Sequence, residues 1–233
     1  MECWYYGTPM ATPGELCNRT AELLGVEPNA TAIAWRTLRE NGKVTTGGRG
    51  RSSAHCVPAD AANLLIATVG KLPLKSVFKS WQRYSTLKGR EDATRSLMER
   101  VPITPELASL KEGHTFFEGM TALVTSATSG TLQKFMLEGL ESDDEVANRI
   151  ATGFVRVRFT APYPQAFIRL HKNNHERAVG LSLKYTDIPI EMNEINEWAE
   201  KPRLADESGD LTHIMEITDH TIFSLGELLR GSK

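Results

Sequence analysis

Hydrophobic residues follow a helical period in the first half of the chain and a strand period in much of the remainder. Four segments repeat apolar residues every three or four positions, as an amphipathic helix does: 12–24, 30–41, 58–69 and 74–88. Between 154 and 185, apolar and polar residues alternate, as in Val155, Arg156 and Val157, which is typical of a strand with one buried face. The pattern therefore predicts an α+β protein with an antiparallel sheet.

The first helix carries signals at both ends. Thr12 suits the N-cap, Pro13 fits the first turn because its missing N–H is not needed there, and Glu15 completes a capping box. Gly25 is placed to end the helix. We therefore expect a short turn and then a second helix.

The second helix, expected over 30–41, is predicted to divide its residues between an inner and an outer side. The inner side holds Ala30, Ile33, Ala34, Thr37 and Leu38. The outer side, at spacings of i, i+3, i+4 and i+7, holds Ala32, Trp35, Arg36 and Arg39. An exposed stripe with an aromatic ring and two guanidinium groups differs from the usual mixture of Glu and Lys, and it favours a binding function.

A glycine-rich tip with two arginines lies between the second and third helices. Two β-capable runs flank this tip, and we interpret 43–57 as a β-hairpin. Its polar residues include Arg49, Arg51, Ser52 and Ser53. Pro58 and Asp60 then begin a third helix that ends at Gly70.

The remaining elements complete the α+β prediction. Further helices are expected over 74–88, 114–127, 131–150 and 218–230. Strands are expected over 154–159, 166–171, 179–185 and 213–217, with the first three joined as an antiparallel meander. The predicted domains are a winged helix-turn-helix at 1–70, a helical connector at 71–113, and an α+β assembly or regulatory domain with an antiparallel sheet at 114–233.

The net charge of −2 conceals an uneven distribution along the 233 residues. Residues 1–90 contain 12 lysines and arginines and six acidic residues, whereas 91–233 contain 15 and 23. A basic part joined to an acidic part suggests that the first part meets a polyanion. Chance placement of charges on solvated faces would give the same count, so the sign of the charge supports this interpretation without deciding it.

Compartment and metal content are constrained by the cysteines and by the absence of long apolar runs. Cys3, Cys17 and Cys56 are scattered and form no CxxC pair, so neither a disulfide framework nor a structural zinc site is expected. No stretch approaches the roughly 20 apolar residues that span a membrane, and the N-terminus lacks the pattern of a signal peptide. We expect a cytoplasmic protein without a membrane partner.

No set of residues predicts catalysis. The segment 171–175 has His-x-x-x-His spacing, but its predicted strand neighbours argue for a loop, and no Glu follows in HExxH form. The glycines at 47–50 lack the Gly-Lys-Ser/Thr ending of a phosphate-binding loop. We expect Cys17 and Cys56 to be small packing residues. We therefore predict a protein that is not an enzyme and that needs no cofactor and no metal.

Residues 12–69 resemble the winged helix-turn-helix of bacterial regulators. The order of helix, turn, helix, hairpin and helix is most similar to the MerR-type DNA-binding domain, in which a helix begun by a proline and an acidic residue also follows the wing. Ala21 and Gly25 match the small residue and the turn glycine of the motif, whereas Ile33, the next apolar anchor, lies further along the chain than in that pattern. Three segments also resemble uncharacterised proteins encoded in prophages of alphaproteobacteria: 12–19, 47–54 and 58–65.

These residues form a predicted contact surface for duplex DNA. The major groove admits one helix, where Arg36 and Arg39 would pair with guanine or hold phosphates and Ala32 would lie against a thymine methyl. Trp35 would pack on the sugar-phosphate backbone. The wing arginines suit a narrow minor groove, and the serines can donate to phosphates. The predicted DNA-binding residues are Ala32, Trp35, Arg36, Arg39, Lys43, Arg49, Arg51, Ser52 and Ser53.

The function expected from this surface is sequence-specific transcriptional regulation, as a phage or prophage repressor or activator. Because winged regulators usually read pseudo-palindromes as dimers, we expect a homodimer, with RNA polymerase or another regulator as a further partner. Two alternatives stay open. One is a phage DNA-packaging or replication factor that uses the same module, and the other is a protein-interaction adaptor whose winged helix has no affinity for DNA.

Overall fold

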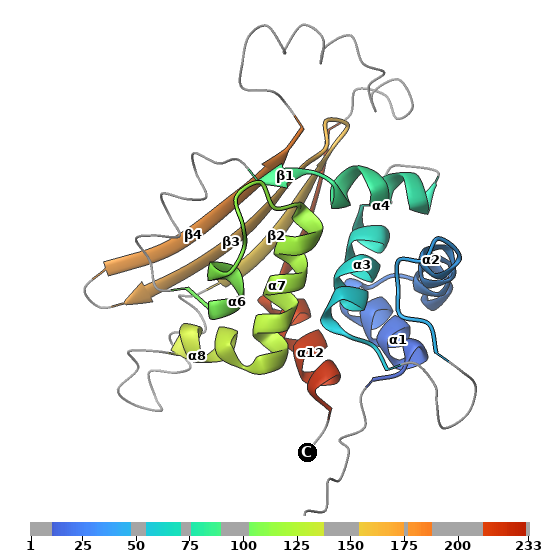
Figure 1. The fold of residues 1–233 in the computed structure, drawn as a ribbon, viewed down its shortest axis with the longest axis horizontal. Helices are drawn as coiled ribbons and strands as arrows, with labels where there is room; N and C mark the ends of the chain where they lie inside the picture. Colours follow the sequence, from blue (N-terminus) through green and yellow to red (C-terminus); the bar gives the residue numbers. More distant parts are fainter. Residues whose placement is uncertain are drawn as a thin grey trace, which may run out of the picture.

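The computed structural model describes residues 11–47, 55–70, 76–89, 103–137, 154–174, 177–187 and 212–231. Its helices are α1 (Pro13–Leu24), α2 (Pro28–Glu40), α3 (Pro58–Val69), α4 (Val77–Ser85), α6 (Pro105–Ala108), α7 (Phe116–Ser129), α8 (Thr131–Leu137) and α12 (Asp219–Arg230). Its strands are β1 (Lys88–Gly89), β2 (Phe154–Ala161), β3 (Gln165–Asn174), β4 (Arg177–Thr186) and β5 (His213–Thr218). The α+β class expected from the sequence is confirmed (Figure 1).

Helix α1 begins and ends where its sequence signals predict. The Thr12 side chain accepts a hydrogen bond from the backbone N–H of Glu15, and the Glu15 carboxylate accepts one from the Thr12 N–H at 2.7 Å. Gly25 ends the helix with φ at +62°, a left-handed conformation that glycine adopts without steric cost. Local chemistry, rather than distant packing, therefore decides the ends of this helix.

The strands form one antiparallel sheet in the order β1-β4-β3-β2-β5. Val157 on β2 lies opposite Ile168 on β3 and opposite Ile217 on β5, while Ile168 also lies opposite Leu183 on β4. All four side chains are buried, so one face of the sheet supplies a continuous apolar surface. The alternation in the sequence predicted this face and the meander.

The expected helix over 74–88 is wrong at its C-terminal end. Helix α4 ends at Ser85, and Lys88 and Gly89 instead pair with Thr186 and Tyr185 at the edge of the sheet. The N–H of Gly89 also donates to the carbonyl of His114 at 2.9 Å. These bonds come from segments far away in the chain, which a helical period cannot reveal.

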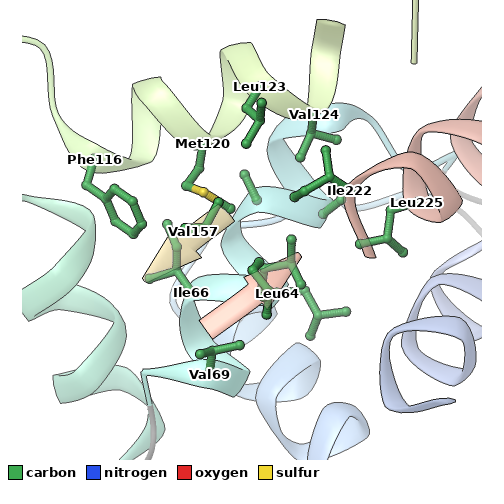
Figure 2. Close-up of a cluster of buried hydrophobic side chains, with 14 of the residues drawn as sticks. Leu64, Ile66, Val69, Phe116, Met120, Leu123, Val124, Val157, Ile222 and Leu225 are labelled. Atoms are coloured by element: carbon green, nitrogen blue, oxygen red, sulfur yellow. The ribbon is translucent and has the colours of Figure 1, made fainter. Parts of the chain in front are cut away.

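Helices cover one face of the sheet, and the core continues through them. Helices α7 and α12 pack against the strands, α3 packs on α7, and α1 and α2 lie beyond α3 (Figure 1). Figure 2 shows Leu64 and Ile66 of α3 facing Met120 of α7, Val157 of β2 and Ile222 of α12. One buried cluster therefore spans all three segments into which the sequence was divided.

The C-terminal helix is fixed to α7 by a close approach and by an arginine. A Cβ atom on Gly226 would lie 2.6 Å from the Cβ of Ala127, so only glycine allows this separation of the two helices. Arg230 donates from Nε to the carbonyl of Thr128 and from Nη2 to that of Ala127, both at 2.7 Å. The last carbonyls of α7 are thus paired by a guanidinium, which also suits the helix dipole.

Candidate nucleic-acid interface

The two sides of α2 differ from the prediction by a rotation of the helix. Its buried residues are Thr31, Ala34, Trp35 and Leu38. Ala32, Arg36 and Arg39 are exposed, as expected. Trp35 is only 7% exposed, so its assignment to the outer stripe was wrong, and Ile33, assigned to the inner side, is 45% exposed. Burying the large indole removes more apolar surface from water than burying Ile33 would, and this sets the rotation.

Among the exposed residues of α2, one arginine is already paired. The Arg36 Nε donates to the Glu40 carboxylate at 2.7 Å, one helical turn away. This hydrogen bond and the carboxylate charge raise the pKa of Arg36, which is cationic in any case. Both side chains are more than half exposed, so water screens the pair and a phosphate could compete for the guanidinium.

Asp60 holds both ends of the loop that was predicted to be a wing. Its Oδ1 accepts from the N–H of Thr45 at 2.7 Å, and its Oδ2 accepts from the N–H of Val57 at 2.9 Å. The Asp60 side chain is 2% exposed and belongs to the first turn of α3. The stems before and after 48–54 are therefore fixed to the N-terminus of one helix.

Asn63, one turn along α3, fixes Lys43 in the same region. Its Nδ2 donates to the carbonyl of Lys43 at 2.6 Å, and its Oδ1 accepts from the Trp81 indole N–H at 2.8 Å. The Lys43 Nζ lies 5.0 Å from the centroid of the Trp81 ring, within the range of a cation–π contact. The exposed Lys43 is thus held near the C-terminal end of α2.

The β-hairpin expected over 43–57 is wrong for the residues that the structure describes. Residues 43–47 and 55–57 contain no strand, because their backbone groups bond to Asp60 and to Ala11 instead of to each other. The remaining predicted contacts lie outside the described residues: Arg49, Arg51, Ser52 and Ser53. The structure thus brings together Ala32, Arg36, Arg39 and Lys43 near one helix.

Cys17, Cys56 and His114 are buried in packed positions. Burial raises the pKa of the Cys17 thiol to about 11 and, with the charge of Asp60, that of Cys56 to about 12. His114 is 6% exposed and bonds at 2.9 Å to both the Lys111 carbonyl and the Tyr185 hydroxyl. Because a carbonyl only accepts, Nδ1 donates and Nε2 accepts from Tyr185. Burial lowers the pKa of His114, which favours this neutral form of the ring.

No group of three His, Cys, Asp or Glu among the described residues could hold a metal ion. The loop expected over 171–175 is wrong for its described residues, because β3 continues through His171 to Asn174, while His175 lies outside the described residues. None of the described helices has the length and apolar character that crossing a bilayer requires.

Sequence reasoning missed a second cationic surface, on the face of the sheet opposite the helices. Arg156 and Arg158 alternate with buried residues of β2, and Phe167, Arg169 and Lys184 do the same on β3 and β4. The alternation of residues in each segment predicts a strand, but it does not show which polar side chains become neighbours across strands. The strand register determines that, and it brings Phe167 opposite both Arg158 and Lys184.

Comparison of the chain with protein-family models, with curated proteins and with solved structures gave no match. The case for a function therefore depends on the residues and their geometry.

Proposed function

We propose that this protein binds duplex DNA through α2 and the loop that follows it, and acts as a sequence-specific transcriptional regulator. The observation that carries the proposal is the division of α2, which buries its apolar side and leaves Ala32, Arg36 and Arg39 exposed along the other. An α-helix fits the major groove, where arginine can pair with guanine and a small side chain permits close approach to the bases.

Each exposed group has a role in this proposal. Arg39 and Arg36 contact base edges or phosphates, and Arg36 exchanges Glu40 for the DNA. Lys43, held by Asn63 and Trp81, contacts the phosphate backbone beside the helix. The contacts predicted from the sequence for Arg49, Arg51, Ser52 and Ser53 lie outside the described residues and stay predictions. Trp35 packs in the hydrophobic core beneath α2 and does not contact DNA.

The regulator is proposed to act as a homodimer on two half-sites, since one short helix reads only a few base pairs. Light scattering coupled to size-exclusion chromatography measures this directly. A monomer at micromolar concentration that binds a single half-site would contradict the dimer while leaving the contact surface intact.

The test is a binding titration of the full chain on a pool of random duplexes, followed by sequencing of the selected fraction. Wild-type protein should enrich a defined motif, and its affinity should fall steeply with salt because each neutralised phosphate releases counterions. Arg36→Ala with Arg39→Ala should lose both the motif and at least about tenfold in affinity, as expected when two base or phosphate contacts are removed.

A matched control removes the same charge elsewhere. Lys111 and Lys134 are exposed and lie outside α1–α4, so Lys111→Ala with Lys134→Ala should bind like wild type. Equal loss in both double variants would mean that only net charge matters, and no loss in the α2 variant would refute the proposed surface.

One observation favours a protein-interaction adaptor as a second candidate. Ile33 is 45% exposed on α2, beside the arginines, where a partner protein docked on this helix would cover it. Ile33→Ser should leave DNA binding unchanged if the regulator proposal holds. An absence of any salt-sensitive DNA binding by the wild type would favour the adaptor.

A further inference from the structure

The sheet face that points away from the helices is basic along three adjacent strands. Its described cations are Arg156, Arg158, Arg169 and Lys184, each alternating with buried residues of its own strand. Strands β2, β3 and β4 contain no acidic residue at all. A sheet face that only needed to be soluble would mix both signs of charge, so this arrangement suits a polyanion.

An aromatic ring lies among these cations. In the register of the sheet, Phe167 is opposite Arg158 on one neighbouring strand and Lys184 on the other. The Arg169 guanidinium carbon lies over the Phe167 ring, 5.3 Å from its centroid, and the Lys184 Nζ lies over it at 5.7 Å. Phe167 is therefore fixed by neighbours on its own strand and on the next one, and it remains only partly buried. A base that stacks on this ring takes the place of one of these cations.

Glu216 of β5 orients the arginines at one side of this face. Arg158 donates from Nε to Glu216 Oε2 at 3.0 Å and also approaches it with Nη2 at 2.8 Å, while Arg156 Nη1 lies 3.4 Å from Oε1. This carboxylate therefore contacts both guanidiniums and holds them in defined positions. Preorganised arginines lose less side-chain entropy when a phosphate binds.

We propose that this sheet face binds single-stranded DNA, with a base stacked on Phe167 and the neighbouring phosphates paired with the cations around it. An aromatic ring within a basic groove or sheet is the arrangement by which proteins bind single strands without reading their sequence. Duplex DNA hides the faces of its bases in the helical stack, so it could use the charges of this surface but not the ring. Neither stacking nor phosphate pairing requires a 2′-hydroxyl.

The proposal is independent of the duplex-binding surface on α2. The two surfaces belong to different elements, α2 in one case and β2, β3 and β4 in the other, and they share no residue. A negative result for one binding surface therefore leaves the proposal for the other unaffected. Loss of duplex binding in the α2 variant would say nothing about the sheet, and the reverse also holds.

The experiment measures fluorescence anisotropy of a labelled oligothymidine of about 12 nucleotides, within the usual site size of a single-strand-binding surface. It uses the full chain and three variants: Phe167→Leu, Phe167→Tyr, and Arg169→Ala with Lys184→Ala. We expect Phe167→Leu, which keeps an apolar side chain, to weaken binding at least about fivefold, the lower end for the loss of one base stack. Phe167→Tyr should restore binding, because a stacking ring is present again.

Further arms separate the rival explanations. The Arg169→Ala, Lys184→Ala variant should bind more weakly and with a smaller salt dependence, whereas Lys111→Ala with Lys134→Ala, which removes the same charge from exposed positions elsewhere, should bind the oligothymidine like wild type. Circular dichroism and urea unfolding check that each variant is folded. Photo-crosslinking of an oligonucleotide containing 5-iodouracil should mark the peptide that includes Phe167.

Three outcomes would overturn the proposal. The first is an absence of binding by the folded wild type, and the second is wild-type affinity in Phe167→Leu. The third is much tighter binding of an oligouridine of the same length. The last would assign the face to RNA, since the 2′-hydroxyl would then contribute to recognition.

Discussion

Trp35 in α2 and Phe167 in β3 are both aromatic residues in arginine-containing segments, yet the fold uses them in opposite ways. Trp35 is 7% exposed and belongs to the core, whereas Phe167 lies on the open face of the sheet between cations. A helix can rotate so that an adjacent residue is buried instead, but a strand has only two faces. The contact role of an aromatic residue is therefore more safely assigned from strand alternation than from a helical stripe.

The largest expected effect contrasts these two residues directly. Trp35→Ala should reduce the free energy of unfolding by about 3–5 kcal/mol, because it leaves a large cavity in the core. Phe167→Ala should reduce it by less, about 1–2 kcal/mol, because its ring is only partly buried. Urea unfolding followed by circular dichroism measures both. Similar losses in the two variants would mean that one of the rings has been placed wrongly.

A second prediction concerns the two hydrogen bonds of Asn63 on α3. Asn63→Ala removes partners from the Lys43 carbonyl and from the Trp81 indole N–H. Leaving these groups unpaired should cost about 1–3 kcal/mol of unfolding free energy. Gln133, exposed on α8, provides the control variant Gln133→Ala, which should unfold like wild type. A stability of Asn63→Ala equal to that of the control would show that water replaces both bonds.

The third prediction concerns His114, a titratable residue whose ring bonds to the Lys111 carbonyl and to the Tyr185 hydroxyl. Burial lowers the pKa of His114 below its ordinary 6.5. As the pH falls through about 6.5, this histidine binds a proton in the unfolded chain but not yet in the native state. The free energy of unfolding therefore decreases until the pH reaches the lowered pKa of the native state.

His114→Gln should therefore reduce the loss of unfolding free energy between pH 7.5 and pH 5, measured by urea unfolding at each pH. Asn63→Ala, lacking any titratable change, should shift stability equally at all pH values. An unchanged slope in His114→Gln would contradict a neutral buried ring.

The smallest expected effect is a change in duplex affinity when one charge on α2 is removed. Glu40→Gln removes the partner of Arg36 and one negative charge, and duplex affinity should rise about twofold, in keeping with the weakness of exposed helical pairs. Glu227→Gln, on the exposed side of α12, removes the same charge at a distance. An equal rise in both would attribute the effect to net charge alone, and it would leave Arg36 without a specific role.

Local signals predicted more of this fold than of its surfaces. Thr12, Glu15 and Gly25 act on their own backbone, so the sequence located both ends of α1. The strand regions were likewise predicted, because Val155, Val157 and their neighbours alternate regardless of what they contact.

What the sequence could not supply depends on long-range contacts. The rotation of α2 depends on which side chain fills the space next to α3, and the strand at Lys88–Gly89 exists because β4 offers a free edge. The close approach of Gly226 to Ala127 is another contact without a local signature. The basic sheet face depends on the register of three strands, which a single segment does not encode.

The two hydrogen bonds of Asp60 have a consequence for how this region could vary between proteins. Thr45 and Val57 are brought to the two oxygens of one carboxylate, so the segment between them begins and ends at fixed points on the body of the protein. Lengthening such a closed segment adds little entropic cost. Residues could be inserted or exchanged there without disturbing α2 or α3, which would make it a natural place for new binding specificities to evolve and a practical position for grafting them.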